Sequence, residues 1–175
     1  EKYEYAFVNK ENEIIPNNQE NTLESYSSPS RHIESSQINN FITIAVAGCM
    51  NRIGTTTQSI QIAKYFIANN KSACVVEMNQ SGYFKLMSEY YAAQYINHEI
   101  GQIRIENVDL FYHPENISQI LSIGYDYIIY DFGAFHKNFP KTQFIEKQYK
   151  FIVAGTKPNE LVQTLPVLQS FSHDD

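Results

Sequence analysis

The chain has 175 residues, of which 43% are hydrophobic and 18% are charged, and its formal net charge is -6 at pH 7. This composition is typical of a soluble globular protein with one domain. No apolar run reaches the roughly 18 residues that a membrane-spanning helix needs, and no segment has the pattern of an export signal. The sequence predicts a cytoplasmic protein without a transmembrane segment, at most peripheral to a membrane complex. Its acidic balance argues against direct binding of nucleic acid.

The first 40 residues are rich in Asn, Ser and Glu, with seven acidic and three basic side chains. They contain too few large apolar groups to offset the entropy lost on ordering. We therefore expect a polar, flexible segment at 1–40, in which Tyr3–Val8 and Ile14–Ile15 can form a short hairpin. A single domain would then occupy 41–175. The chain starts without a methionine, so missing flanking segments are not excluded.

From Phe41 onward, β-prone apolar runs alternate with apolar residues at helical spacing. Strands are predicted at 41–47, 73–76, 103–105, 108–111, 127–130 and 151–154. Helices are predicted at about 60–67, 83–95 and 117–123, and a last one places Leu161, Leu165 and Leu168 on one face. Pro166 should kink this last helix or shift its start. The alternation predicts an α/β fold with a doubly wound, mostly parallel sheet and helices on both faces.

The loop after the first strand is the candidate binding site. In open α/β sheets the first strand-to-helix loop collects free backbone N–H groups at a helix start, which suits an anion. Residues Gly48 to Thr57 occupy that place and include Asn51-Arg52-Ile53-Gly54-Thr55-Thr56-Thr57. This segment, with the flanking 42–47 and 62–66, resembles the phosphate loop of the ParA/MinD-like ATPases, which reads K-G-G-x-G-K-[ST]-[ST].

The resemblance implies that both lysines of this loop are missing. The family's first lysine falls on Met50, its two glycines on Asn51 and Arg52, its second lysine on Thr55, and its magnesium-binding hydroxyl on Thr56. In the family the first lysine reaches across a nucleotide-sandwich dimer, so any homodimer of this chain would form without that contact. The chain is thus identified as a degenerate member of the deviant Walker A group of P-loop NTPases.

Three later segments extend the resemblance to about residue 171. Residues 75–82 resemble the family's V-[DE]-x-D-x-Q-G motif, whose second Asp positions the attacking water and corresponds to Asn79. Residues 125–131 resemble the Walker B strand, and Asp131 matches its magnesium-linked carboxylate. Residues 151–158 resemble the next strand and its exit loop. A family member would run on to a further strand that contacts the base, so we expect a C-terminal truncation here.

The resemblance implies a nucleotide site at 51–57, with ATP as the ligand and with Thr56 and Asp131 holding magnesium if nucleotide binds. Phosphoryl transfer depends on positioning and on charge stabilisation. Thr55 cannot supply the lost charge, and Asn79 cannot activate water as a carboxylate does. Arg52 offers one cation but a different geometry. We therefore expect hydrolysis to be absent or very slow, with nucleotide binding weak or lost.

Simpler explanations compete for several of these residues. Thr55, Thr56 and Thr57 would also be explained as helix caps. Cys49 lies in the loop before a helix, where a thiol can serve as a redox switch, but an ordinary small loop residue is the better interpretation. The five histidines lack the spacing of a metal site. Core packing is the expected role of Tyr90, Tyr91 and Tyr95, with an aromatic contact surface as the alternative.

Three functions remain open from the sequence. The leading hypothesis is a catalytically impaired ParA/MinD-like protein that acts as an assembly, positioning or regulatory subunit of a larger machine of the secretion, pilus or DNA-transfer type. The second is an active ATPase that uses Arg52, Lys64 or a partner's cation in place of the missing lysines. The third is a regulatory binding module whose segment 1–40 docks it to a membrane protein or a receiver domain.

Overall fold

The computed structural model of the chain describes residues 41–91 and 93–171. The hairpin predicted in the first 40 residues lies outside this part. The described elements are β1 (Ile42–Gly48), α1 (Thr55–Ala68), β2 (Ala73–Glu77), α2 (Tyr83–Tyr90), β3 (Gln94–Asn97), β4 (Gln102–Ile105), β5 (Val108–Phe111), η1 (Pro114–Asn116), α3 (Ile117–Ser122), β6 (Tyr127–Ala134), α4 (Lys141–Ile145), β7 (Tyr149–Val153) and α5 (Pro158–Phe171).

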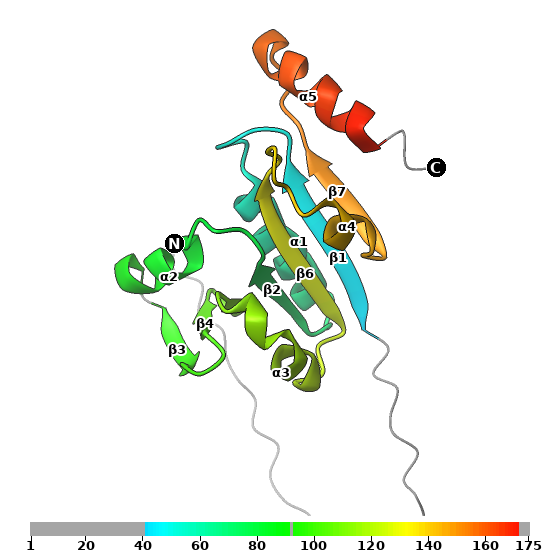
Figure 1. Cartoon of the computed structure of the whole chain (residues 1–175). Coiled ribbons are helices and arrows are strands. Elements are labelled where there is room, and N and C mark those ends of the chain that lie inside the picture. Colours follow the sequence, from blue (N-terminus) through cyan, green and yellow to red (C-terminus); the bar gives the residue numbers. More distant parts are fainter. Residues whose placement is uncertain (1–40, 92, 172–175) are drawn as a thin grey trace, which may run out of the picture. The chain divides into compact units, whose positions relative to one another are not determined.

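One seven-stranded sheet contains all the described strands, in the order β3-β4-β5-β2-β6-β1-β7. The strands β5, β2, β6, β1 and β7 are parallel to one another. The pairs β3-β4 and β4-β5 are antiparallel. The predicted doubly wound, mostly parallel α/β fold is confirmed, and the carboxyl ends of β1, β2 and β6 meet at one edge of the sheet (Figure 1).

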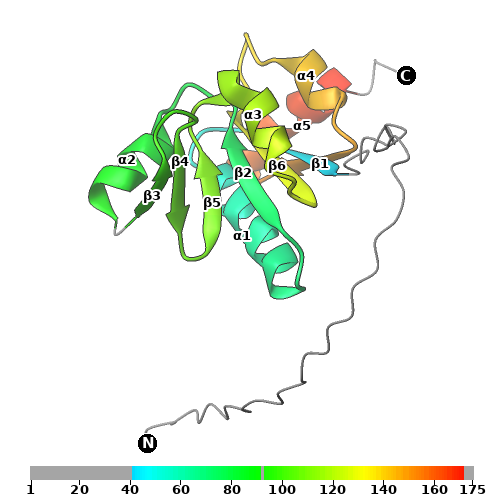
Figure 2. The same ribbon diagram turned by 90° about the horizontal axis from the view of Figure 1, so that it is seen from below.

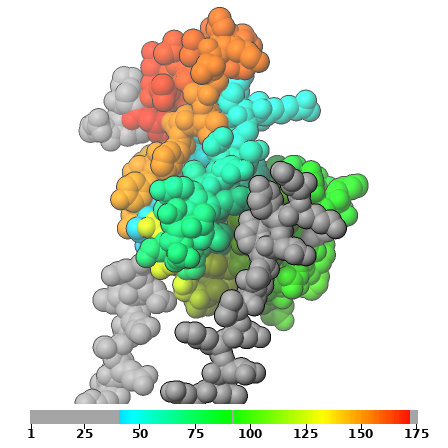
Figure 3. All heavy atoms as spheres, turned by 180° about the vertical axis from the view of Figure 1, so that it is seen from behind, coloured from blue at the N-terminus to red at the C-terminus, as the bar shows by residue number. Residues whose placement is uncertain are grey.

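Helices cover both faces of this sheet. On one face, α1 packs through Ala63 and α2 through Phe84 against apolar side chains of the strands. On the other face, Ile120 of α3 and Phe144 of α4 pack against a second apolar cluster, together with Phe171 at the end of α5. Figure 2 shows α3 and α4 on one side of the sheet and α1 on the other. Figure 3 shows the molecule from behind the view of Figure 1, with the atoms of α1 near the middle of this face.

The central strands are buried on both faces, which explains why their sequence runs are almost continuously apolar. Four successive residues of β1, from Ile44 to Ala47, are at most 3% exposed. None of the helices among the described residues has the length and apolarity that a bilayer crossing needs.

The predicted helix over 83–95 is wrong in its second half. α2 ends at Tyr90, and Gln94–Asn97 forms the edge strand β3, which pairs with β4. Pairing with β4 therefore overrides the helical spacing, as tertiary contacts often do. The core role expected for the three tyrosines here is also wrong, because Tyr90, Tyr91 and Tyr95 are 81%, 59% and 43% exposed. The short helix α4 was not predicted.

The last helix is continuous across Pro166 and begins at Pro158, a residue type favoured in the first helical turn. Glu160 assists this start, because its carboxylate accepts a hydrogen bond from the Lys157 backbone N–H at 3.0 Å. The helix packs through Thr164 and Val167. Leu161, Leu165 and Leu168 do share one face, as predicted, but each is about half exposed.

Candidate functional site

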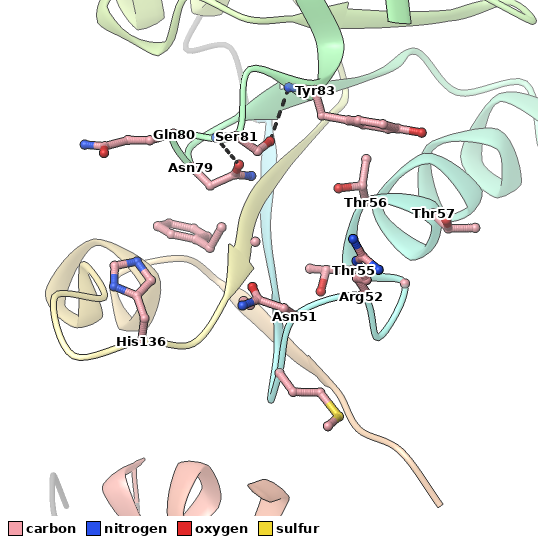
Figure 4. A pocket seen from close by; sticks show the side chains of 15 residues that line it. Asn51, Arg52, Thr55, Thr56, Thr57, Asn79, Gln80, Ser81, Tyr83 and His136 are labelled. Carbon is pink, nitrogen blue, oxygen red and sulfur yellow. Dashed lines mark hydrogen bonds between the residues drawn. The ribbon is translucent and has the colours of Figure 1, made fainter. Parts of the chain in front are cut away.

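A pocket of about 590 Å³ lies beyond the carboxyl ends of β1, β2 and β6. Three connections line it: the loop from β1 to α1, the loop from β2 to α2, and the segment at and after the end of β6 (Figure 4). The lining residues are Met50, Asn51, Arg52, Gly54, Thr55, Thr56, Thr57, Asn79, Gln80, Ser81, Tyr83, Phe132, Gly133, Ala134 and His136. The structure thus brings the predicted phosphate loop, apart from Ile53, to one pocket with Asn79.

The phosphate loop has the backbone shape of an anion cradle. Arg52 and Gly54 both adopt left-handed conformations, with φ of 60° and 94°, and alternating hand turns successive N–H groups toward one point. Gly54 is the residue before α1, and no side chain caps this helix start. Capping by Thr55, Thr56 or Thr57 is therefore wrong. The first-turn N–H groups of α1 remain available to a ligand.

Thr55, which the motif resemblance aligns with the second lysine of the phosphate loop, has its side chain buried at the end of β1. It is 7% exposed. A Cβ atom on Gly48 would lie 2.2 Å from Thr55 Oγ1 and 2.6 Å from Ile53 Cγ2, so only glycine fits beneath the loop. The Ser59 hydroxyl also donates to the Thr55 carbonyl at 3.1 Å. Thr55 therefore packs closely on Gly48 at the end of β1 and offers no charge to the pocket.

Asp131 lies fully buried in β6, beneath Thr56. Its Oδ1 accepts a hydrogen bond from the Gly133 N–H at 2.9 Å. Its Oδ2 is buried without a hydrogen bond of standard geometry from the described residues. Burial raises the pKa of this carboxyl; the Thr56 hydroxyl and the Gly133 N–H oppose the rise, while Glu77 adds to it.

A buried carboxylate oxygen without a hydrogen bond of standard geometry fits one ligand position of a magnesium ion. Thr56 and Asp131 together fit two such positions, as the resemblance implies, and a phosphate and water would have to supply the others. Among the described residues, no group of three or more His, Cys, Asp or Glu side chains is placed to hold a metal by itself.

Asn79 joins two walls of the pocket. Its Nδ2 donates to the Asp131 carbonyl at 3.1 Å, and its Oδ1 accepts from the Ser81 N–H at 2.9 Å. Gly133 packs closely against it, because a Cβ atom there would lie 3.0 Å from Asn79 Cβ and Cγ. Both ends of the Asn79 amide are thus engaged in backbone contacts, and Asn79 has no carboxylate with which to take a proton from water.

Glu77 organises the second wall. Its Oε1 accepts hydrogen bonds from the Ser81 hydroxyl and from the Tyr83 N–H, both at 2.7 Å. Its Oε2 accepts a longer one from the Phe84 N–H at 3.4 Å. A carboxylate at a helix start satisfies free N–H groups and complements the helix dipole. Glu77, which is 3% exposed, therefore fixes where α2 begins.

Arg52 is the one lysine or arginine among the residues that line the pocket. Lys64, the second cation considered from the sequence, forms an ion pair with Glu106 and lies outside the lining. Its proposed role as a replacement lysine is therefore wrong. Cys49 is buried and accepts a hydrogen bond from the Thr164 hydroxyl at 3.2 Å, as an ordinary packed residue does.

Sequence reasoning missed several residues of the site. Glu77 stands in the sequence as part of a motif, and an acidic residue at the end of an apolar strand is the signal of a local cap. Glycine at position 133, two residues after Asp131, indicates an unusual backbone, here with φ of 67°. Tyr83 and His136 carry no signal in the sequence, because only the folded loops bring them to the pocket.

Comparison with known proteins gives matches only at the level of structure. No protein-family sequence model and no curated protein matches the chain. A ParA family ATPase from Chlorobium tepidum TLS is similar, with a TM-score of 0.52 and 15% identity, over 78% of this chain and 69% of that one. The MinD cell division protein of Aquifex aeolicus is similar with a TM-score of 0.55 and 14% identity, over 77% and 66%.

The MinC:MinD cell division protein complex of Aquifex aeolicus gives a further similar chain, with a TM-score of 0.55 and 16% identity, over 77% and 66%. This chain spans about two thirds of the length of each of these proteins. The described domain therefore has the fold of the ParA/MinD-like P-loop NTPases.

Proposed function

We propose that this protein is a catalytically impaired relative of the ParA/MinD-like ATPases that acts as an assembly, positioning or regulatory subunit of a larger machine. The observation that carries the proposal is the engagement of Asn79, whose amide bonds the Asp131 carbonyl and the Ser81 N–H. At the place where the family has a water-positioning carboxylate, this protein has a group that ties two loops together. Hydrolysis therefore lacks its proton acceptor.

The charge of the pocket supports the same proposal. The place of the second lysine holds the buried Thr55, and the place of the first holds Met50. One guanidinium, that of Arg52, remains for the phosphates. A triphosphate would thus meet the N–H groups of the cradle and one cation, an arrangement that can bind an anion but stabilises little of the charge that develops during phosphoryl transfer.

Magnesium with a nucleotide is the ligand that this site fits best. Thr56 and Asp131 would hold the ion, which would neutralise phosphate charge, and the cradle at Arg52 and Gly54 would hold the phosphates. Weak binding without turnover would make the nucleotide a structural ligand. The role as a subunit of a secretion, pilus or DNA-transfer machine, in the cytoplasm or at the periphery of a membrane complex, follows from fold analogy. The complex of MinD with MinC supports the idea of a protein partner.

The test is calorimetric titration of the full chain with ATP, ADP and tripolyphosphate, each with and without magnesium, together with a phosphate-release assay. We expect weak, magnesium-dependent binding and no release above the uncatalysed background. Arg52→Ser should weaken binding at least fivefold, whereas Lys64→Ser, which removes a cation outside the pocket, should leave it unchanged. Turnover at ordinary ATPase rates, about 1 per second or faster, contradicts the proposal.

An active ATPase that relies on Arg52 is the second candidate, because Arg52 is the cation at the pocket and it keeps a left-handed backbone that glycine would adopt more easily. The same assay separates the two. Turnover that disappears in Arg52→Ser supports the second candidate, while binding without turnover supports the first. A homodimer would form without the lysine contact, and equilibrium sedimentation with and without ATP tests this.

A further inference from the structure

One wall of the pocket lies across from the phosphate loop and belongs to two segments of the chain, the loop after β2 and the segment at and after the end of β6 (Figure 4). We call it the distal wall, and its residues are Asn79, Gln80, Ser81, Gly133, Ala134 and His136. A phosphate group beyond those held by the cradle at Arg52 and Gly54 would meet the groups of this wall.

Donors on both segments of the distal wall are already used within the protein. The Ser81 N–H donates to Asn79 Oδ1 at 2.9 Å, and the Ser81 hydroxyl donates to Glu77 at 2.7 Å. Asn79 Nδ2 donates to the Asp131 carbonyl at 3.1 Å, and the Gly133 N–H donates to Asp131 Oδ1 at 2.9 Å. A phosphate that took one of these hydrogens would break one bond to form another, so it would gain little net free energy.

The distal wall also lacks a permanent cation. None of its residues is a lysine or an arginine, and Arg52 belongs to the phosphate loop across the pocket. Gln80 and His136 are exposed, so water can already satisfy their polar groups, and exchanging water for phosphate gains little. A third phosphate group therefore adds negative charge that this wall does not neutralise.

The two segments of the distal wall are held in place by the chain itself. The Asn79 amide ties the first segment to β6, and a Cβ atom on Gly133 would lie only 3.0 Å from Asn79 Cγ. The Phe135 N–H donates to the Gly48 carbonyl at 2.7 Å, which fixes the second segment to β1. In many nucleotide switches the terminal phosphate orders such loops. Here hydrogen bonds within the protein already do so.

We propose that this pocket binds diphosphate and triphosphate groups with nearly equal affinity, because the distal wall does not recognise the third phosphate. Such binding presupposes the proposed function, since it requires a phosphate chain in the cradle. A ligand shifts a conformational equilibrium only through different affinities for the two states. The ligand is thus a fixed part of the structure, and its occupancy follows the total amount of nucleotide and not the ratio of ATP to ADP.

The test is calorimetric titration of the full chain, with magnesium, using pyrophosphate, tripolyphosphate, ADP and ATP. The two inorganic anions remove any contribution of the base and the ribose. We expect the dissociation constants within each pair to agree within about threefold. Amide hydrogen exchange, read by NMR, should show the same protection of Ser81 and Gly133 with both inorganic anions. A preference of about tenfold or more for the longer anion would overturn the proposal.

Asn79→Ala tests the cause of this equal binding. It frees the Ser81 N–H, which can then donate a charge-assisted hydrogen bond, so tripolyphosphate should gain at least about threefold over pyrophosphate. Asn97→Ala is the matched control, because Asn97 Oδ1 accepts from the Glu99 N–H at the same 2.9 Å outside the pocket. It should leave the ratio unchanged. An unchanged ratio in Asn79→Ala would overturn the proposal, and if that variant does not fold, the wild-type ratio decides alone.

Turnover distinguishes this proposal from the proposed function. Tighter binding of tripolyphosphate without phosphate release from ATP would overturn this proposal and leave the proposed function standing. Phosphate release together with equal binding of the two inorganic anions would do the reverse. A preference for tripolyphosphate that disappears in His136→Ala would overturn the proposal and assign recognition of the third phosphate to that imidazole. Binding of neither inorganic anion would also overturn it, while a lack of phosphate release would still support impaired catalysis.

Discussion

The side-chain amide of Asn79 donates a hydrogen bond to the backbone carbonyl oxygen of Asp131, 3.1 Å away, and so ties the loop after β2 to the end of β6. The Met78 N–H donates to the same carbonyl at 2.8 Å. A carboxylate at position 79 could not donate. Replacing the asparagine with the family's aspartate would therefore remove a structural contact as well as introduce a base.

We expect Asn79→Asp to lower the free energy of unfolding by about 1–3 kcal/mol, because the Asp131 carbonyl loses a donor and meets a negative charge. It should not restore ATP hydrolysis by itself, because the lysines are still absent. Chemical denaturation and a phosphate-release assay measure the two effects. Gln80→Glu adds the same charge at the exposed neighbouring residue and is the control. An unchanged stability in Asn79→Asp would contradict the role given to this contact.

Asp131→Asn should raise the stability of the ligand-free protein by about 1–2 kcal/mol at neutral pH, because it removes a buried charge whose Oδ2 accepts no hydrogen bond of standard geometry from the described residues. Burial raises the pKa of Asp131 in the folded state, so the wild-type protein loses stability as pH rises from the ordinary carboxyl pKa through the raised one. Below that window the carboxyl is protonated whether the chain is folded or unfolded, and the gain from Asn should vanish.

Thermal unfolding of both proteins between pH 3 and pH 8 measures this difference. Under the proposed function the same variant should lose magnesium-dependent nucleotide binding, which titration measures separately. A gain in stability that persists at pH 3 would show that the charge is not its cause.

Arg52→Gly should make the loop more stable and less able to hold an anion. A left-handed conformation disfavours arginine relative to glycine by about 1–2 kcal/mol, while glycine adds about 0.5–1 kcal/mol of unfolded-state entropy. We therefore expect a net gain of about 0.5 kcal/mol, visible as a higher melting temperature, together with weaker binding of tripolyphosphate. Asn70→Gly changes another left-handed residue outside the pocket and should change stability without changing binding.

Gly48→Ala should destabilise the protein by about 1–3 kcal/mol, because its Cβ would lie 2.2 Å from Thr55 Oγ1. Thr55→Ala in the same chain removes that oxygen and should recover part of the loss. A double-mutant cycle in urea gives the coupling, which we expect to be at least about 0.5 kcal/mol. Additive effects of the two changes would mean that Thr55 does not pack on Gly48.

Much of the fold can be read from the sequence because its signals are strong. The strands at 42–48, 73–77 and 127–134 are buried on both faces, so their apolar runs are almost unbroken. β3 could not be predicted, because all four of its residues are exposed and only pairing with β4 makes them a strand. α4 has five residues, too few for a helical period to be recognised.

The site is predicted only in part, for a related reason. The positions of Thr56, Asn79 and Asp131 follow from motifs that are local in sequence, and the fold brings these residues close together. Their hydrogen bonds depend on atoms from distant segments. Thr55 packs on Gly48, and Asn79 donates a hydrogen bond to a carbonyl 52 residues away. Neither contact can be predicted without the folded backbone.

The cap of α2 by Glu77 has a thermodynamic consequence for the pocket. The Ser81 hydroxyl lines the pocket and donates its hydrogen to Glu77, and the same carboxylate holds the first N–H groups of α2. A ligand that takes this hydroxyl as a donor competes with the cap, so binding and fraying of the first turn of α2 are linked. By reciprocity, a second ligand or partner that stabilises that turn lowers the affinity of the pocket for such a ligand by the same factor.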